Sequence, residues 1–407
     1  MTSESFPRTG HGMDRRGLFG VVAGGSVVAA MAAGCTRKNA SSPELNGDDP
    51  RDPRGRTWSP HQEHQAGITS PTPAVTVIVS LDLVKGADRD ALRRFLKMWS
   101  ADIEALMAGR KVPGDPLQDM AQPNVSLSVT VGFGLGFFRV PGLEKYLPDG
   151  LAEIAPMKHD KLVEDWSGGD LVVQICADDP TSAAYAQRIL VRDAKPFATP
   201  RWVQHGSWRA IGGDGKPITG RNLFGQVDGT GNVLEDAGNK IWTDAGQSWF
   251  TGGTMMVVRR IEMNLTTWDE LTRERQEKAM GRTLDVGGPL SGPNEEMKPL
   301  NFSARDQDGK LLVPIDSHAR LSNPASNGGR TMFRRSTNYT HDEGGKTTHG
   351  LMFVSFQTSI PGVFTPVQKR LDASDALNEW TTAIGSAVFA VPGGWPQGKF
   401  LAHGLFA

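Results

Sequence analysis

The sequence predicts an α+β fold built from two ferredoxin-like α/β sandwiches, one in each half of the folded part of the chain. In the first half, apolar segments follow the order strand, helix, strand, strand, helix, and a further strand near 202–210 would complete the sandwich. A similar order of elements recurs in the second half. Because no residue-level repeat is visible, the two sandwiches are inferred from the order of elements alone.

Length and composition agree with a globular protein of two domains or of one large domain. The chain has 407 residues, and single cores rarely grow beyond roughly 250 to 300 residues. Apolar residues make up 38% of the chain, and with the 48 glycines they reach the share that is usual in globular proteins. The 44 basic and 45 acidic side chains leave a net charge of −1. This balance gives no electrostatic basis for binding nucleic acid and favours an uncharged or weakly charged substrate.

The first 35 residues are predicted to be an export signal. Arg15 and Arg16 directly precede the uncharged run 18–33, which is too short to span a bilayer, because a spanning helix needs about 20 apolar residues. This pattern indicates a twin-arginine signal, whose export machinery carries proteins that have already folded, commonly around a cofactor. The protein is therefore expected outside the cytoplasm, either extracellular or in the cell envelope.

The end of the signal resembles a lipoprotein cleavage box. Ala32-Ala33-Gly34 precedes Cys35, with Ala where Leu is commoner. A lipid on Cys35 would anchor the protein at the outer face of the cytoplasmic membrane, and the sequence leaves this modification open. The other cysteine, Cys176, lies in an apolar strand and is predicted to be a small buried residue, so an intrachain disulfide is excluded.

Residues 36–73 are predicted to form a disordered linker. The segment is rich in Ser, Pro, Asp, Gly and Arg and has hardly any apolar residues. It contains His61 and His64, whose spacing is compatible with a metal site but is more typical of solvated linker residues.

The N-terminal domain, 74–218, is predicted from hydrophobic periodicity. A β-branched run opens it, and a helix with apolar side chains at three- and four-residue steps follows. Strict alternation of polar and apolar residues over 125–131 is typical of a strand with one solvated or polar face. The predicted elements are strands 74–79, 125–131 and 170–176, and helices 88–107 and 181–190.

The C-terminal domain, 219–407, is predicted to repeat this order of elements around a long loop. The expected elements are strand 253–260, helix 267–280, strand 351–357 and helix 374–384. The loop 281–339 is rich in Gly, Pro, Asn and Ser. Loops of this length in compact domains commonly bind a ligand, so the functional site is expected there.

Three groups in the second half could act together. The stretch Gly225-Gln226-Val227-Asp228-Gly229 places a carboxylate on a glycine turn, ahead of the lone loop residue His318 and the pair Arg334-Arg335. Taken singly, an Asp between glycines commonly caps turn amides, and a loop His is commonly a surface residue. A carboxylate, a histidine and an arginine are nevertheless the three groups that a haem peroxidase needs.

These segments resemble the dye-decolourising peroxidase family. The stretch 222–232 is similar to the GxxDG signature of the family, with the following Thr and Asn in place. The segment 318–324 is similar to the one that holds the proximal haem ligand, and 333–336 resembles the distal arginine segment. Further matches occur in the family's order at 350–357, 375–380 and 385–394, so the similarity covers about 74–394.

The resemblance implies a fold related to the dimeric α/β barrels, with haem b held in the C-terminal half. His318 would be the ligand of the haem iron, and Asp375 would accept a hydrogen bond from its other ring nitrogen. On the opposite face Asp228 would act as the base that moves the peroxide proton, and Arg334 would stabilise the negative charge that develops as the O–O bond breaks. Arg335 is expected to be structural.

Other residues are assigned around the haem by the same resemblance. Gly229 and Thr230 belong to the signature and would lie beside the cofactor. Arg320 and Arg330 are in the segments that would meet the two propionates, and for each a surface charge is an equal alternative. Trp380 stands where the family commonly has a tyrosine, and with Tyr339 it is a candidate electron relay, although packing is the more frequent role of such rings.

The function implied by the resemblance is that of an exported haem peroxidase. It would use hydrogen peroxide to oxidise a small or bulky reducing substrate of phenolic, dye-like or metal-complex type, by one-electron steps through a ferryl intermediate. The alternative is an exported lipoprotein that binds haem or handles haem iron without significant peroxidase turnover. A hydrolase is not supported, because neither GxSxG nor HExxH occurs.

Overall fold

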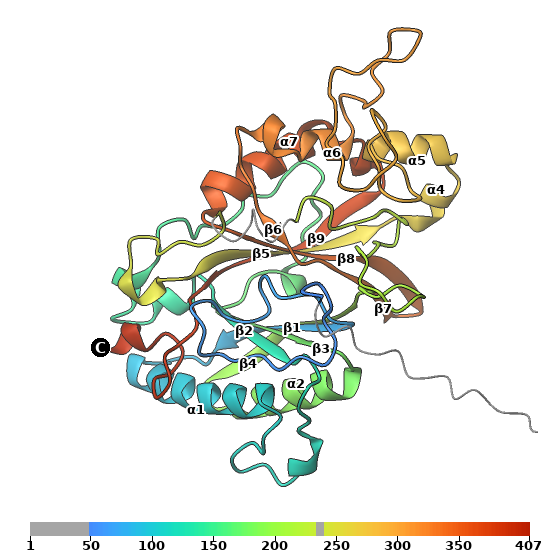
Figure 1. Cartoon of the computed structure of the whole chain (residues 1–407). Coiled ribbons are helices and arrows are strands. Elements are labelled where there is room, and N and C mark those ends of the chain that lie inside the picture. The colour runs from blue at the N-terminus through green and yellow to red at the C-terminus, as the bar shows by residue number, and fades with distance from the viewer. Residues whose placement is uncertain (1–48, 233–239) are drawn as a thin grey trace, which may run out of the picture. The chain divides into compact units, whose positions relative to one another are not determined.

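The computed structural model describes residues 49–232 and 240–407 (Figure 1). The predicted export signal, Cys35 and the first part of the predicted linker lie outside these residues. The helices are α1 (Arg89–Met107), α2 (Pro180–Ala194), α4 (Leu265–Asp269), α5 (Arg273–Met280), α6 (His318–Leu321) and α7 (Thr365–Ser374). The strands are β1 (Val75–Leu83), β2 (Ser128–Phe133), β3 (Leu171–Ala177), β4 (Ala198–Ser207), β5 (Thr254–Met263), β6 (Phe333–Arg334), β7 (Thr337–Glu343), β8 (Lys346–Gln357) and β9 (Thr381–Val391).

The strands form one antiparallel sheet that closes on itself. The strand order is β5-β9-β2-β3-β1-β4-β7-β8-β6. Because β5 also pairs with β8, eight strands form a closed ring, and the two-residue strand β6 pairs with β8 in addition. Among the described residues, strands of the two halves pair with each other only at two short places, where Phe133 pairs with Ala390 and Ser207 pairs with Asn338. Within each half the strand order is that of a ferredoxin-like sandwich. The predicted fold class of two such sandwiches is therefore confirmed.

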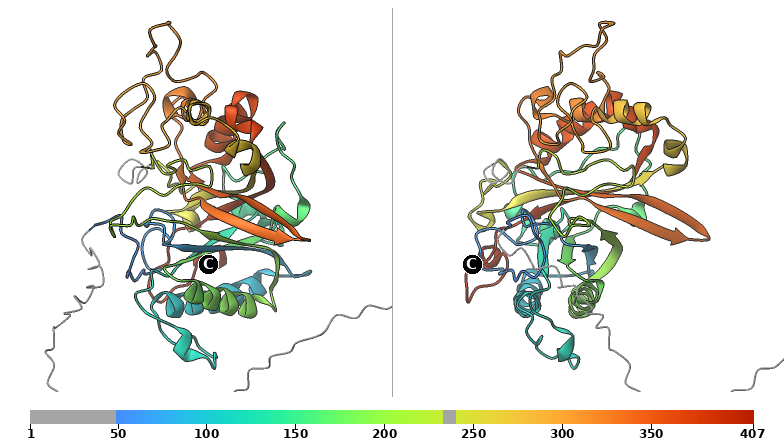
Figure 2. Two further views of the ribbon diagram at one scale, coloured as in Figure 1. Left: turned by 90° about the vertical axis from the view of Figure 1, so that its right-hand side faces the viewer. Right: turned by 45° about the vertical axis from the view of Figure 1, so that its right-hand side comes forward.

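Helices cover both outer faces of this ring (Figure 2). On the N-terminal half, α1 and α2 pack over β1–β4 around a core that includes Trp99, Phe95 and Ile189. On the C-terminal half, α4 to α7 and their loops cover β5 and β9, with Trp268 and Trp380 in a smaller core. A third core lies between the two sheets. A cavity lies between these C-terminal helices and the sheet.

Local sequence signals account for the two long helices. Asp88 caps α1 by accepting a hydrogen bond from Ala91 N at 2.7 Å, and the apolar stripe of this helix is buried. Asp179 caps α2 in the same way, and Pro180 begins that helix. Proline suits this position because the first turn needs no N–H partner.

Two predictions for the C-terminal helices were wrong in detail. The segment 374–384 was expected to be a helix, but α7 ends at Ser374 and the strand β9 begins at Thr381. The reason is Asp375, whose backbone is extended and whose carboxylate accepts a hydrogen bond from Leu377 N at 2.9 Å, so it ends one helix and caps a single short turn. The predicted helix 267–280 is divided into α4 and α5.

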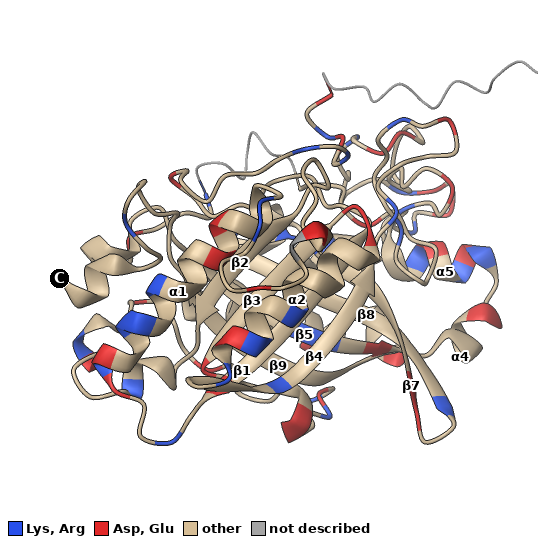
Figure 3. Cartoon of the chain, turned by 90° about the horizontal axis from the view of Figure 1, so that it is seen from below, with Lys and Arg blue, Asp and Glu red and all other residues tan. Residues whose placement is uncertain are grey.

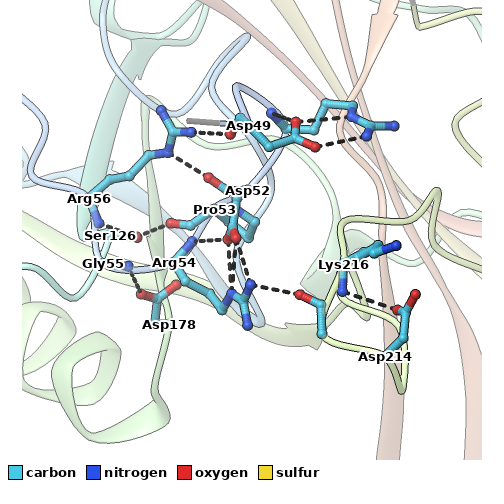
Figure 4. Close-up of polar contacts among 12 residues, drawn as sticks. Asp49, Asp52, Pro53, Arg54, Gly55, Arg56, Ser126, Asp178, Asp214 and Lys216 are labelled. Carbon is cyan, nitrogen blue, oxygen red and sulfur yellow. Dashed lines mark hydrogen bonds and ion pairs between the residues drawn. The ribbon is translucent and has the colours of Figure 1, made fainter. Parts of the chain in front are cut away.

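The part of the predicted linker that the structure describes, 49–73, is not disordered. Asp52 forms an ion pair with Arg54, and Gly55 N donates to the Asp178 carboxylate at 2.9 Å (Figure 4). Arg56 donates to the carbonyl of Asp52 at 2.5 Å. Arg56 N also donates to the Ser126 hydroxyl at 3.1 Å. Bonds within the segment and bonds to Ser126 and Asp178 of the N-terminal domain together explain why a segment with few apolar side chains is ordered.

The same segment covers the polar face of β2. Gln65 donates to the carbonyl of Val131 at 2.9 Å, and Thr130 donates to the carbonyl of Ala66 at 2.6 Å. All six residues of β2 are buried, so its predicted polar face is present but is not solvated. Cys176 is buried and has no disulfide, as predicted.

His61 and His64 are packed rather than solvated. The Nδ1 atom of His61 lies 3.0 Å from the carbonyl oxygen of Trp395, and that of His64 lies 2.8 Å from the carbonyl oxygen of Gly252. The ring of His64 also stacks on Trp242 at a centroid distance of 3.6 Å. The two histidines therefore anchor the segment 49–73 to the C-terminal part of the chain.

Basic and acidic residues are interspersed along the elements on the side of the molecule that carries α1 and α2 (Figure 3). This distribution is consistent with the net charge of −1 for the whole chain. Within 49–232 and 240–407, no helix is both long and apolar enough to cross a membrane.

A buried carboxylate in α1 makes stability depend on pH. Asp102 is 3% exposed, and burial together with the charge of Asp193 raises its pKa to about 7. The pKa of Asp102 in the folded protein lies above its pKa in the unfolded chain. The contribution of Asp102 to the free energy of unfolding is therefore fully present below about pH 4 and is lost as the pH rises through 7. We expect Asp102→Asn to be more stable than the parent by about 3 kcal/mol at pH 8 and by little at pH 4. Urea unfolding at both pH values measures the difference.

Asp90→Asn is the matched control, because Asp90 lies exposed on the same helix. Its substitution should change the free energy of unfolding by less than about 1 kcal/mol at either pH. An Asp102→Asn variant whose stability relative to the parent is the same at pH 4 and pH 8 would contradict the assignment.

Candidate active site

A cavity of about 310 Å³ lies between the C-terminal sheet and the helices above it. Because side chains alternate across a strand, Arg259, Ile261 and Met263 of β5 face this cavity, whereas Met256 and Val258 face the core between the sheets. Neighbouring strands add residues in register with them, as in the pair Ile261 and Leu351. The sheet side of the cavity is lined by Arg259, Ile261, Met263, Leu351, Phe353, Thr381 and Ala383.

The glycine turn positions Asp228 at the edge of the cavity. Gly225 has a φ of +78°, which favours glycine, and its N–H donates to the carbonyl of Asn222 at 3.0 Å. The Asn222 side chain accepts hydrogen bonds from Phe224 N at 3.0 Å and Gln226 N at 3.3 Å. Its amide also donates to the Asp228 carboxylate at 3.3 Å. The turn thus holds the Asp228 carboxylate in place through the side chain of Asn222.

Arg334 reaches the same cavity from β6. It lies on the opposite face of the strand from Phe333, which packs into the core between the sheets. Asn232 holds its backbone on both sides, because Arg334 N donates to the Asn232 amide oxygen at 3.1 Å and the Asn232 amide donates to Arg334 O at 2.5 Å. The guanidinium of Arg334 donates to Thr230 O at 3.2 Å. The turn that carries Asp228 and the strand that carries Arg334 are thereby joined.

His318 faces the cavity from the helical side. It begins α6 directly after Ser317, whose hydroxyl donates to the carbonyl of Pro314 at 2.8 Å. The Nδ1 atom of His318 lies 2.6 Å from an oxygen of Asp375, and within the described residues Nε2 has no hydrogen-bond partner. Burial lowers the pKa of His318, but the Asp375 carboxylate outweighs this effect, so the pKa is raised above its usual value. The contact predicted for Asp375 is therefore present.

The remaining predicted residues divide between the cavity and its surroundings. Thr230 and Arg330 line the cavity, whereas Gly229 lines a smaller cavity next to it. Arg320 does not line either one. Its guanidinium donates to the carbonyls of Phe302 and Val313, each at 3.0 Å. One terminal nitrogen of Arg320 is thus occupied by loop carbonyls, and its contact with a propionate remains a prediction.

The two candidate relay residues are packing residues in this structure. Trp380 is 6% exposed and meets the ring of Trp268 edge-on at 5.2 Å. Tyr339 is 2% exposed, and burial raises its pKa to about 12. Its hydroxyl has no hydrogen-bond partner among the described residues, so no group there would accept its proton on oxidation. Neither ring lines the cavity, and the relay role remains a prediction.

Several cavity residues were not predicted from the sequence. Arg259 lines the cavity next to its buried ion-pair partner Asp160, and Asn222 and Asn232 hold the two distal side chains. An arginine that follows the buried apolar run 255–258 within the same strand was the signal for Arg259. The pairing with Asp160 had no signal, because 99 positions separate the two residues.

The residues of the cavity fit a haem. One side presents a single imidazole whose Nδ1 is held by a carboxylate, which suits axial ligation through Nε2. Apolar side chains such as Leu351, Phe353 and Met263 suit the porphyrin plane, and the Asp228 and Arg334 side chains suit a polar ligand on the other side. The class of protein that this fold and site define is the haem peroxidases.

Comparison with known proteins identifies the family within this class. Residues 65–208 match the N-terminal model of the Dyp-type peroxidases, and residues 219–395 match the C-terminal model. The chain therefore belongs to the Dyp-type peroxidase family, and its cofactor is haem.

Relatives and solved structures agree with this assignment. A Dyp-type peroxidase from Cellulomonas bogoriensis has a similar structure, with a TM-score of 0.82 and 42% identity over 87% of this chain and 99% of that chain. A dye-decolorizing peroxidase from Thermobifida fusca is 36% identical over 84% of this chain and 83% of that protein. A deferrochelatase from Yersinia pestis is 30% identical over 95% and 93% of the two chains.

The hydrogen bond between Asp375 and His318 provides a testable prediction. An amide at position 375 keeps the shape of the side chain but removes the negative charge that orients and polarises the imidazole. We expect Asp375→Asn to lose roughly 10- to 100-fold in haem affinity or in the rate of reaction with peroxide. It should also raise the reduction potential of the haem, because a less electron-rich imidazole stabilises the ferric state less.

A haem titration and a spectroelectrochemical measurement test this expectation. Asp372→Asn is a demanding control, because Asp372 also lines the cavity and pairs with a histidine, His159, at 3.0 Å. It should leave the potential nearly unchanged. Equal shifts of the haem reduction potential in Asp375→Asn and Asp372→Asn would contradict a specific role for the bond between Asp375 and His318, because the loss of any nearby carboxylate would then have the same effect.

Proposed function

We propose that the protein uses hydrogen peroxide to oxidise phenolic, dye-like or metal-complex donors by one-electron steps. Membership of the Dyp-type peroxidase family supports a peroxidase. The Thermobifida fusca relative is a dye-decolorizing peroxidase, which supports dyes as one class of donor. Bound haem would supply the redox chemistry that couples the two-electron reduction of the peroxide to one-electron oxidation of the donors.

The distal residues would provide proton transfer and charge stabilisation. The Asp228 carboxylate would take the proton from one peroxide oxygen and return it to the other, which leaves as water when the O–O bond breaks. The Arg334 guanidinium would stabilise the negative charge on the leaving oxygen. Because Asn222 and Asn232 hold these residues in place, little reorganisation would be needed during the reaction.

The observation that carries this proposal is that one cavity is lined by His318, Asp228 and Arg334 together. The test is an absorption spectrum of the haem-loaded protein before and after one equivalent of hydrogen peroxide, followed by a phenolic donor. We expect peroxide to change the Soret band and the donor to restore it. A Soret band that stays unchanged under excess peroxide would sink the proposal.

A second candidate is a haem-binding or haem-iron-handling protein without significant peroxidase turnover. The observation in its favour is the similarity to proteins named deferrochelatase, which extends over 95% of this chain. Such a protein needs His318 and the cavity but not the distal pair. Under this alternative, the Asp228→Ala and Arg334→Leu variants would behave like the parent in every haem assay.

We infer from residues 1–35 that the protein is exported by the twin-arginine route, with a lipid on Cys35 as a possible anchor. The motif of paired arginines before a short uncharged run supports this inference. Cell fractionation of an Arg15→Lys, Arg16→Lys double variant tests it. The parent should be found outside the cytoplasm and the variant inside, and identical distributions would contradict export by this route.

A further inference from the structure

A second pair of a histidine and a carboxylate lies in the active-site cavity, in addition to His318 and Asp375. His159 and Asp372 both line this cavity. The Nδ1 atom of His159 lies 3.0 Å from an oxygen of Asp372, and the backbone N–H groups of Lys158 and His159 donate to the same carboxylate at 3.0 Å each. Within the described residues, Nε2 of His159 has no hydrogen-bond partner. One ring nitrogen of a cavity-lining histidine is therefore available to a ligand.

The Asp372 carboxylate determines which ring nitrogen of His159 can accept a proton. Burial raises the pKa of Asp372, but the hydrogen bonds from the two backbone N–H groups and from the imidazole outweigh burial, so this pKa is lowered. An ionised carboxylate accepts hydrogen bonds and donates none, so Nδ1 carries the proton and Nε2 of the neutral ring is an acceptor. The same carboxylate would stabilise the ring once Nε2 is protonated. The pair thus has the arrangement of an oriented general base.

The pair lies where the cavity meets solvent. The His159 side chain is 33% exposed. Lys158 and Ala373, which adjoin His159 and Asp372 in the chain, are exposed. A molecule that enters the cavity at this opening would contact the His159 ring.

This opening is at the opposite edge of the sheet from the distal arginine. The segment that carries His159 runs beside β9, because Lys161 N donates to Ala383 O at 2.9 Å. Arg334 is on β6, and the strands of this half lie in the order β9, β5, β8, β6. Three strand spacings of about 4.8 Å each, roughly 14 Å in all, therefore separate the two edges. A donor at His159 would not compete with peroxide for the distal residues.

A phenolic donor needs a proton acceptor at the place where it gives up an electron. A phenol keeps its proton at neutral pH, because its pKa is about 10, as in the tyrosine side chain. Loss of one electron makes that proton strongly acidic, so a base within hydrogen-bond reach of the hydroxyl lowers the barrier. His159 supplies such a base at the opening of the cavity.

We propose that His159 is the proton acceptor for phenolic donors and that Asp372 is its positioning residue. The hydroxyl of the donor donates a hydrogen bond to Nε2 of His159. The O–H bond then breaks: the electron goes to the oxidised haem, the proton goes to Nε2, and the phenoxyl radical leaves. The imidazolium returns the proton to water before the next donor binds. This inference rests on the proposed function and names the donor class that its site is built to accept.

The test compares guaiacol, a phenol, with ferrocyanide, which loses an electron but no proton. His159→Gln keeps a polar side chain but removes the base. We expect it to slow guaiacol oxidation at least tenfold, the lower part of the range for general base catalysis, and to change ferrocyanide oxidation by less than about twofold. The return of the Soret band after one equivalent of peroxide measures both rates. His159→Phe, which also removes the hydrogen-bond acceptor, should in addition weaken guaiacol binding to the resting haem-loaded protein, measured by a difference spectrum.

Two further variants complete the experiment. His205→Gln makes the same change at an exposed position of β4, outside both cavities, and should leave both rates unchanged. Asp372→Asn keeps the imidazole but not its orientation, so it should slow guaiacol oxidation less than His159→Gln does.

The outcomes separate this inference from the proposed function. Equal losses with guaiacol and ferrocyanide in His159→Gln would show that His159 acts on the haem, for example through a propionate, and would overturn the assignment. Parent-like guaiacol rates in both His159 variants would overturn it as well. A parent protein whose Soret band does not respond to peroxide would instead overturn the proposed function.

Discussion

Replacing His318 by alanine is expected to lower the affinity for haem by roughly a hundredfold or more. The loss of a hydrogen-bond partner behind a metal ligand already costs 10- to 100-fold, and here the ligand itself is removed. Within the described part of the cavity wall, the other histidine is His159, whose Nδ1 atom is paired with Asp372 at 3.0 Å. A titration of the apoprotein with haem, followed at the Soret band, measures the change.

His205→Ala is the control for this variant, because His205 is exposed on β4 and lines neither cavity. It should bind haem as the parent does. If His318→Ala kept the parent affinity and the parent spectrum, the iron would have a different ligand and the proposed arrangement of the cavity would be wrong.

Removal of the Arg334 guanidinium is expected to slow the reaction with hydrogen peroxide at least a hundredfold. Removal of one donor aimed at developing negative charge in an oxyanion hole costs about 2.7 to 4 kcal/mol, a factor of about 10² to 10³, and we expect a loss of similar size here. Arg334→Leu should still bind haem, because His318 and Asp375 lie on the other side of the cavity. Asp228→Ala should slow the same step by a factor of about 10² to 10⁴, the range of general acid–base catalysis.

Stopped-flow spectra of the haem-loaded variants measure these rates directly. Arg305→Leu serves as the control, since Arg305 lies on the exposed loop and donates to the carbonyl of Gly309 at 2.6 Å. Whichever distal variant is slower identifies the residue with the larger catalytic weight. Rates equal to that of the parent in both variants would remove the distal pair from the mechanism.

The two-sandwich fold could be predicted because each half is encoded by local periodicity. The β-branched run at the start of β1 and the apolar stripe of α1 need no information from the rest of the chain. The prediction was wrong where one polar side chain ended a helix that the apolar pattern had suggested would continue. Asp375 ends α7 and caps a short turn, and the strand β9 that follows was taken for the rest of a helix.

The segment 49–73 shows a second limit of prediction. Its composition is that of a disordered chain, and composition is a sound guide when a segment has to form its own core. This segment instead lies on the polar face of β2 and satisfies the buried side chains there. Its order comes from a surface that is formed by residues far away in the sequence.

The sequence by itself determined the chemistry available to this protein. It supplied one histidine in a long loop, a carboxylate on a glycine turn and an arginine pair, in an order that indicated the family. Tertiary structure alone decided which of these groups meet. Strand alternation directed Arg334 into the cavity and Arg335 towards Ser70, while loop carbonyls took up one terminal nitrogen of Arg320.

The physical reason is the range of the interactions. Helices, strands and turns depend on neighbours within a few residues, and their periodicity is written in the local sequence. The bond from His318 to Asp375 spans 57 positions, and the bonds from Asn232 to Arg334 span 102. Such pairs form only after the sheet has closed and the helices have packed, so their geometry had to come from the folded protein.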